Sequence, residues 1–293
     1  MWAAVRSVLA VVGFTVAATT SPVSAAAAAT LPPIAAAITS IQPSGDQPVG
    51  VAHPVVVTFD GPVVDRVAAE HALRVRSVPA MTGRYEWVED SVVHWRPDAF
   101  WPAHSTVTLS VGGLTTEFKT GPAVLGVADL TAHTFTVSVD HLGVTPGPPL
   151  PAAHHLPHYG EAGVLPASMG KEKFPTPVGT YTVLAKDRSV VMDSSSVGIP
   201  IDDPEGYRLT VDHAVRISAR GIYVHSAPWA LRSLGVENTS HGCINLSPTD
   251  AEWYFDTANI GDPVIVIEGP AIEGPADRGP AEREPAADGP AGE

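Results

Sequence analysis

The segments GIYVHSAPW (residues 221–229) and SHGCIN (residues 240–245) carry most of the structural information in this sequence. β-Branched and aromatic residues in the first segment predict a strand over residues 221–225 that ends at His225. The second segment is polar and contains glycine, which is typical of a tight turn. This turn holds Cys243, the only cysteine of the chain, two residues after His241. Folding therefore decides whether the imidazole of His225 reaches a thiol that lies 18 residues further along the chain.

A catalytic cysteine needs a group that takes its proton, because the thiolate is the nucleophile and a free cysteine has a pKa of about 8.5. Both His225 and His241 are candidates for that group. Gly242 leaves backbone room for a carbonyl substrate beside the sulfur. The amide N–H groups of Gly242 and Cys243 are then expected to hold the oxyanion that develops during attack. These residues favour acyl-transfer chemistry on a cysteine.

Other interpretations of the same residues stay open at this point. Cys243 is also consistent with a small buried apolar side chain, or with a link to another chain. His225, His241 and Cys243 would suit a zinc ion with one open position. The histidines at 154, 155 and 158 lie in a Pro-rich loop, where we expect solvated side chains or adventitious metal binding.

The surrounding residues 122–267 predict a mostly-β domain with one or two helices. A helix is expected to begin after Ser247, a good N-cap, with Pro248 at its first position, and to stop before Gly261. Strands are expected at residues 133–139, 179–184, 214–218, 221–225 and 264–267.

The preceding residues 41–121 show short strands and turns, at a spacing that suits an immunoglobulin-like β-sandwich. We find no constellation of catalytic groups there, so the expected role is that of a spacer or interaction module. Strands are expected at residues 55–59, 73–78, 92–97 and 105–111.

The two ends of the chain have a different composition. Residues 1–25 resemble a secretory signal peptide, with Arg6, an apolar run at 8–18 and small residues before a cleavage site near Ala25. An uncleaved anchor is the alternative. Residues 26–40 form an Ala/Pro-rich linker. Residues 268–293 repeat proline every five residues and carry a net charge of −5, which predicts a disordered tail or a cell-wall spacer. We therefore expect an exported protein, either of the cell wall or periplasmic space or secreted. Membrane contact is expected only through the signal segment, if that segment is not cleaved.

Composition excludes several classes of protein. The net charge is −14, so few positively charged side chains are available to neutralise a phosphate backbone. We therefore expect no nucleic-acid partner. A single cysteine excludes an intramolecular disulfide and a four-thiolate metal cluster. The 29 prolines and 26 glycines favour strands and turns over long helices.

His225, followed after fourteen residues by Ser240-His241-Gly242-Cys243-x-Asn245, resembles the signature of the L,D-transpeptidases, which have a YkuD-type catalytic domain. The segments at 168–171, 192–196, 206–208 and 225–229 are similar to actinobacterial enzymes that make 3→3 peptidoglycan cross-links. Residues 59–63 and 92–97 resemble the immunoglobulin-like domain that precedes the catalytic domain in those enzymes. The resemblance covers roughly residues 45–267.

This resemblance implies a reaction. Cys243 would attack the third-residue carbonyl of a donor tetrapeptide stem, release D-alanine and form a thioester, which the side-chain amine of a second stem would resolve. The resemblance implies peptidoglycan stem peptides as partners and carbapenems as covalent inhibitors. It implies no cofactor and no metal.

The resemblance also implies site residues. His225 would be the general base and acid, and His241 a supporting residue. Tyr207, Gly242 and the Cys243 amide would line the oxyanion site. The remaining residues expected to bind substrate or line the pocket are Met192, Arg220, Gly221, Ser226, Trp229, Ser240 and Asn245.

Two features depart from the family pattern. Arg220 stands where a small polar residue is expected, and the Pro/His-rich insert near residues 141–159 has no counterpart. Alternatives with the same thioester are an L,D-carboxypeptidase, which uses water, and a transferase that attaches a protein amine to peptidoglycan. An alternative of another class is a non-catalytic cell-wall-binding protein.

Overall fold

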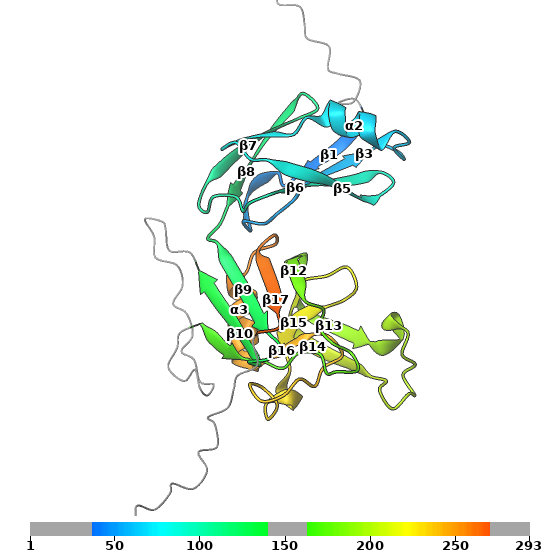
Figure 1. The fold of residues 1–293 in the computed structure, drawn as a ribbon, viewed down its shortest axis with the longest axis vertical. Coiled ribbons are helices and arrows are strands. Elements are labelled where there is room, and N and C mark those ends of the chain that lie inside the picture. Colours follow the sequence, from blue (N-terminus) through cyan, green and yellow to red (C-terminus); the bar gives the residue numbers. More distant parts are fainter. Residues whose placement is uncertain (1–36, 140–162, 270–293) are drawn as a thin grey trace, which may run out of the picture. The chain divides into compact units, whose positions relative to one another are not determined.

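The structure is a computed structural model that describes residues 37–139 and 163–269. The predicted signal peptide, most of the predicted linker, the whole insert near residues 141–159 and residues 270–293 of the predicted tail lie outside the described residues. Strands dominate the described residues, with two sheets before residue 121 and two after it (Figure 1). The prediction of a mostly-β fold is confirmed.

The first two sheets enclose one apolar core. Apolar side chains alternate along the strands and point into this core. Within the core, Trp101 makes an edge-on contact with Phe118, with 5.5 Å between ring centroids. One sheet has the order β1 (Ile38–Gln42), β3 (Val55–Phe59), β6 (Val92–Pro97) and β5 (Gly83–Glu89). The other has the order β2 (Gly45–Val49), β8 (Leu114–Thr120), β7 (Thr106–Val111) and β4 (Arg76–Val78). This arrangement is the predicted sandwich.

Two local predictions for this region are wrong. Residues 38–40, predicted as linker, begin strand β1, because Ile38 and Ile41 pack against the core. The strand predicted over residues 73–78 is instead the end of helix α2 (Arg66–Leu73) followed by β4. Asp65 caps this helix by accepting the Ala68 N–H at 2.9 Å, and Leu73 at its end is fully buried.

The other two sheets form the domain that contains His225, His241 and Cys243. One has the order β11 (Val164–Pro166), β10 (Thr134–Val139), β9 (Val124–Asp129), β17 (Pro263–Ile267) and β12 (Gly179–Thr182). The other has the order β13 (Ala185–Asp193), β14 (Arg208–Arg216), β15 (Tyr223–Ser226) and β16 (Ile244–Leu246). The long β13–β14 hairpin, which the sequence analysis missed, carries the segment 194–207 between its strands.

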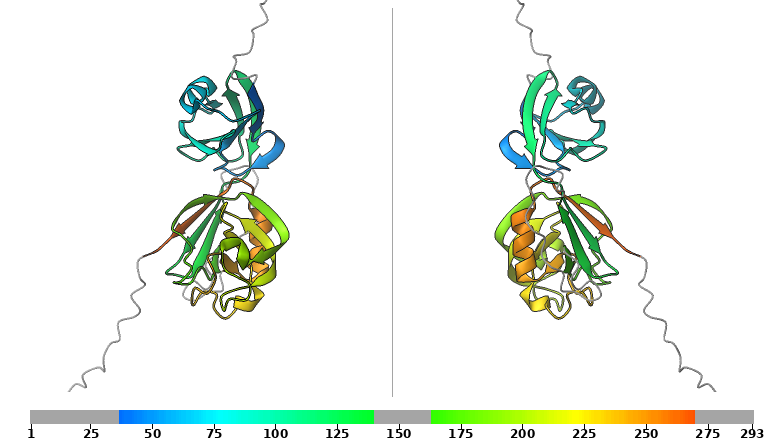
Figure 2. Two further views of the ribbon diagram at one scale, coloured as in Figure 1. Left: turned by 90° about the vertical axis from the view of Figure 1, so that its right-hand side faces the viewer. Right: turned by 90° about the vertical axis from the view of Figure 1, so that its left-hand side faces the viewer.

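Helix α3 (Pro248–Thr257) begins where the sequence predicts it, because the Ser247 hydroxyl accepts the Asp250 N–H. The helix contacts β14 and β15 (Figure 2). Its Tyr254 ring meets Phe135 of β10 edge-on, with 4.9 Å between ring centroids. Its apolar side chains thus join one core cluster with both sheets. This core fixes β15 and β16, the strands that position the site. Within the described ranges, no helix is long and apolar enough to cross a membrane.

Candidate active site

Strand register brings the histidine and the cysteine together. β15 and β16 are parallel neighbours, with Val224 opposite Ile244 and His225 opposite Asn245. Side chains alternate along a strand, so His225, Asn245 and Cys243, two residues before Asn245, belong to one face. Val224 and Ile244 point the other way, into the core. The imidazole and the thiol therefore share one face of two adjacent strands.

His225 is a buried, uncharged base oriented by the backbone. Only 3% of its surface is exposed, and burial lowers its pKa to about 4. Its Nδ1 lies 2.8 Å from the carbonyl oxygen of Ser226. Because a carbonyl only accepts, Nδ1 carries the proton and Nε2 is left with its lone pair. The ring can therefore accept a proton through Nε2 at neutral pH.

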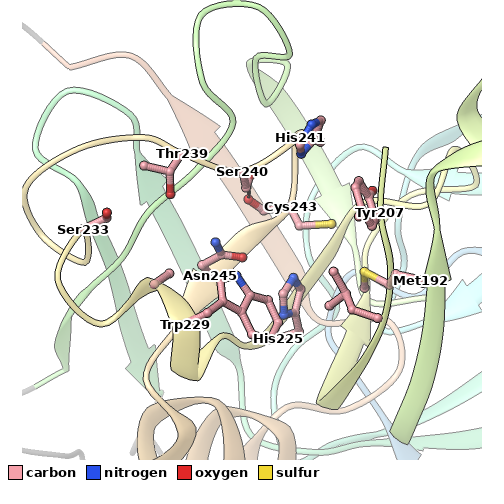
Figure 3. Close-up of a pocket in the computed structure, with 12 residues that line it drawn as sticks. Met192, Tyr207, His225, Trp229, Ser233, Thr239, Ser240, His241, Cys243 and Asn245 are labelled. Atoms are coloured by element: carbon pink, nitrogen blue, oxygen red, sulfur yellow. Dashed lines mark hydrogen bonds between the residues drawn. The ribbon is translucent and has the colours of Figure 1, made fainter. Parts of the chain in front are cut away.

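The thiol of Cys243 rests in its protonated form. Burial raises its pKa to about 11, and a hydrogen bond from the Tyr223 backbone partly offsets this effect. The Sγ atom lies 3.8 Å from the carbonyl oxygen of Gly221, to which it donates weakly. Figure 3 shows the sulfur directed towards Tyr207 and Met192, with the His225 ring below it. The resting pair is thus a neutral thiol and a neutral imidazole.

Side chains hold the turn around the cysteine. The Ser240 hydroxyl donates to the Cys243 carbonyl at 2.6 Å and accepts the Gly242 N–H at 3.0 Å. The buried Thr176 hydroxyl donates to the Gly242 carbonyl at 2.9 Å. Gly242 has a φ of +119°, a conformation that side-chain-bearing residues rarely adopt. The Gly242 N–H, predicted as an oxyanion donor, is bonded to the Ser240 hydroxyl in this structure, so its role in the reaction stays a prediction. The Cys243 amide remains as the backbone donor beside the sulfur.

His241 lies against a charged and aromatic group. Its Nε2 is 3.0 Å from the Glu205 carboxylate, and its ring is 4.8 Å from Phe174 and 5.0 Å from Tyr207 between centroids. Glu205 also pairs with Lys171 and, at 3.5 Å, with Lys173. The ion pair with Lys171, followed by His241, lowers the pKa of Glu205 to about 2.

These groups surround a cavity of about 390 Å³ (Figure 3). Eight residues predicted from the sequence line it: Met192, Tyr207, His225, Trp229, Ser240, His241, Cys243 and Asn245. Four more that the sequence analysis did not name also line it: Leu209, Ala230, Ser233 and Thr239. Apolar walls with a few convergent polar groups are typical of a small-molecule or peptide site.

The structure places other predicted residues outside this cavity. Arg220 is exposed on the turn between β14 and β15 and does not line this cavity, so its predicted role in substrate binding stays a prediction. The next residue, Gly221, contributes only its carbonyl, which faces the cysteine sulfur. Ser226 alternates with His225 along β15, so its side chain points away, and only its carbonyl serves the site.

The geometry does not support the zinc alternative. Among residues 37–139 and 163–269, no three His, Cys, Asp or Glu side chains gather as a metal-ligand group. His225 uses Nδ1 on a backbone carbonyl, and His241 uses Nε2 on Glu205. Whether the histidines at 154, 155 and 158 bind metal stays a prediction, because they lie outside the described residues.

Comparisons with known proteins agree with this geometry. Residues 6–113 match the bacterial Ig domain model, and residues 152–266 match the model of the YkuD L,D-transpeptidase catalytic domain. The chain is 65% identical to "Probable L,D-transpeptidase 3" of Mycobacterium tuberculosis, over 79% of this chain and 87% of that protein.

Solved structures give the same result. L,D-transpeptidase 3 from Mycobacterium tuberculosis in complex with a faropenem-derived adduct is 64% identical, with a TM-score of 0.73 over 79% of this chain and 98% of that one. LD transpeptidase LdtMt1 in complex with imipenem is 46% identical, with a TM-score of 0.69 over 78% and 98% of the two chains. This chain therefore belongs to the L,D-transpeptidase family, with a YkuD catalytic domain behind a bacterial Ig domain.

Proposed function

We propose that this protein forms 3→3 cross-links in peptidoglycan through a thioester on Cys243. One observation carries the proposal: Cys243 and His225 share one face of paired strands and open into the same cavity. Membership of the L,D-transpeptidase family supports it. The donor is a tetrapeptide stem, and the acceptor is the side-chain amine of the diamino acid in a second stem.

The acylation step begins from the neutral pair. As Sγ attacks the carbonyl carbon of the third stem residue, its proton passes to Nε2 of His225 and the carbon–sulfur bond forms. Proton transfer accompanies attack because a thiol with a pKa of about 11 is not ionised beforehand. The carbon–nitrogen bond to D-alanine then breaks, and His225 returns the proton to the leaving amine.

Two donors face the negative charge that develops on the carbonyl oxygen. One is the Cys243 amide beside the sulfur. The other is the Tyr207 hydroxyl, whose pKa is raised by burial and by the nearby Cys243 and Asp193, so that it stays protonated. Hydrogen-bond donors fixed in a partly desolvated site stabilise an oxyanion more than water does.

The second half of the reaction reverses these roles. The acceptor amine attacks the thioester carbonyl, His225 takes a proton from that nitrogen, and the sulfur leaves with a proton from the imidazole. A new amide bond forms and the thiol is restored. β-Lactams of the carbapenem class would acylate the same sulfur by opening their ring, and the structures of two relatives, one with a faropenem-derived adduct and one in complex with imipenem, support this.

We further propose that the reaction takes place outside the cytoplasmic membrane, in the cell wall or periplasmic space. The apolar segment before Ala25 supports export. Mass spectrometry of the protein from its native cells, separated into cytoplasmic and exported fractions, tests this. A protein that stays in the cytoplasm with residues 1–25 attached would contradict it.

A product assay tests the cross-linking activity. The protein is incubated with a disaccharide tetrapeptide, and the products are weighed by mass spectrometry, with Cys243→Ala as the control. We expect a dimer that has lost one D-alanine, together with free D-alanine, and neither product from Cys243→Ala.

Each other product pattern contradicts the proposal in a defined way. Release of D-alanine without a dimer indicates hydrolysis by water, that is, an L,D-carboxypeptidase. Capture of the stem by an added protein amine alone indicates a protein-to-peptidoglycan transferase. No product and no imipenem adduct on Cys243 would indicate a non-catalytic wall-binding protein.

A further inference from the structure

His241 lies where three separate segments meet. The ring belongs to the turn of Cys243, Phe174 of the segment 170–176 packs on it, and Tyr207 of the segment 194–207 packs on it as well. The segment 170–176 is also tied to the turn, since Lys171 N–H donates to the Ser240 carbonyl at 3.0 Å. The position of this imidazole therefore depends on contacts between parts of the chain that are distant in sequence.

Glu205 joins these segments through its carboxylate. One oxygen, Oε2, accepts from His241 Nε2 at 3.0 Å and from Lys171, and the other lies 3.5 Å from Lys173. A carboxylate only accepts, so His241 must carry its proton on Nε2 in this contact. Glu205 thus sets the tautomer of the ring that lies beside the nucleophile.

The backbone that carries Glu205 is itself fixed. The Glu205 N–H donates to the Asp203 carboxylate at 2.8 Å, and Tyr207 N–H donates to the Ser194 hydroxyl at 3.0 Å. A Cβ on Gly206 would approach the Pro200 carbonyl oxygen to 2.2 Å, so the chain folds tightly at this point. The Glu205 side chain is only 24% exposed. These contacts distinguish it from a mobile surface glutamate.

We propose that Glu205 is a positioning residue for the reaction at Cys243. Its carboxylate holds His241 as the Nε2-protonated tautomer and fixes the Tyr207 segment against the nucleophile turn. Glu205 acts through these neighbours and does not itself touch the reacting atoms. This inference rests on the proposed acylation of Cys243.

A positioning role for Glu205 predicts how much its variants slow acylation. Misplacing reacting groups by about 1 Å costs up to about a hundredfold in rate. Loss of the carboxylate in Glu205→Ala releases both His241 and the Tyr207 segment, so we expect the rate constant of acylation to fall about tenfold or more. Glu205→Gln keeps an amide oxygen that accepts the same hydrogen, so we expect a loss of about threefold or less.

Two measurements on the full chain test the proposal. The first is the rate constant of Cys243 acylation by imipenem, followed by intact mass. The second is the ¹⁵N NMR signature of the His241 ring, which distinguishes its tautomers. We expect the Nε2-protonated tautomer in the wild type and in Glu205→Gln, and a mixture in Glu205→Ala. Glu252→Ala, on the exposed face of α3, is the matched control and should equal the wild type in both measurements.

The outcomes separate this inference from the proposed function. If imipenem leaves wild-type Cys243 unmodified, the proposed function fails, whereas the NMR comparison still tests Glu205. If the wild type is acylated and Glu205→Ala is equally fast, or keeps the wild-type tautomer, the inference is overturned. Circular dichroism checks the fold of each variant. Should Glu205→Ala not fold, Glu205→Asp replaces it: its shorter carboxylate should give a slower rate and a mixed tautomer, and wild-type behaviour would overturn the inference.

Discussion

The two sides of the catalytic pocket are held in place by different kinds of bond. On the side formed by β15 and its preceding turn, called the strand side below, backbone groups position the reacting side chains. The Ser226 carbonyl orients His225, and the Gly221 carbonyl and the Tyr223 backbone face the cysteine sulfur. On the side formed by the turn of residues 240–243, called the turn side below, side chains have this role. Glu205 binds His241, and the Ser240 hydroxyl stabilises the turn.

The two sides of the pocket also differ in charge. The strand side is desolvated and uncharged, with a base whose pKa is about 4. The turn side carries the ion pairs of Glu205 with Lys171 and Lys173. In the proposed reaction the proton therefore moves on the neutral side, while the charged side shapes the turn. Backbone contacts survive most substitutions and side-chain contacts do not, so the two sides should respond differently to mutation.

The largest expected effect separates the two histidines. His225→Asn removes the base, and we expect kcat/KM for dimer formation to fall by about 10³-fold, within the usual range for general acid–base catalysis. His241→Asn should cost about tenfold, because this ring supports the turn without taking the proton. The mass-spectrometric dimer assay measures both, with circular dichroism to confirm folding. Equal losses would remove the distinction between the two sides.

The pH dependence tests the neutrality of the strand side. Burial lowers the pKa of folded His225 to about 4, so the base stays uncharged until the pH falls through that value. We expect the acylation rate by imipenem to be steady from pH 8 to about pH 5, and then to drop about tenfold per pH unit below about 4. An acid limb near pH 6.5, the value of an ordinary imidazole, would show that His225 is not desolvated. The stability of each sample at low pH, followed by fluorescence, provides the control.

Ser240→Ala probes the side-chain bonds of the turn. It removes a hydroxyl that joins the Gly242 N–H to the Cys243 carbonyl. We expect the free energy of unfolding in urea to fall by about 1–2 kcal/mol, and acylation to slow severalfold as the turn loosens. An unchanged midpoint with full activity would mean that the backbone alone shapes the turn.

The smallest effect is expected at Ser226, on the other side. Its carbonyl orients His225, whereas its side chain points away from the pocket, so Ser226→Ala leaves the orienting bond in place. We expect kcat/KM to stay within about twofold of the wild type. A loss as large as that of Ser240→Ala would show that the strand side also depends on a side chain.

The sequence predicted the helices and strands that are determined by neighbouring residues in the chain. The Ser247-Pro248 start of α3 and strands such as β3 and β6 follow from a cap and from alternating apolar residues. Helix α2 was missed because Leu73 to Val78 alternates like a strand, although the buried contact of Leu73 is made from a helix end.

Part of the site had no comparable signal. The spacing of His225 and the SHGC turn resembles a family signature, which is why the central residues were named in advance. Glu205 is 36 residues from His241, in a Pro-Glu-Gly turn without a catalytic pattern, and only folding brings the two together. The sequence also does not show that the Ser240 hydroxyl turns back to accept the Gly242 N–H.

The raised pKa of the Cys243 thiol also has a consequence for oxidative damage. Peroxides attack the ionised sulfur, and the upward shift of its pKa to about 11 lowers the ionised population at neutral pH by about a hundredfold or more. We therefore expect the resting protein to convert slowly to the sulfenic acid. In the proposed reaction the same sulfur stays available to an acyl donor, because His225 takes its proton at the moment of attack.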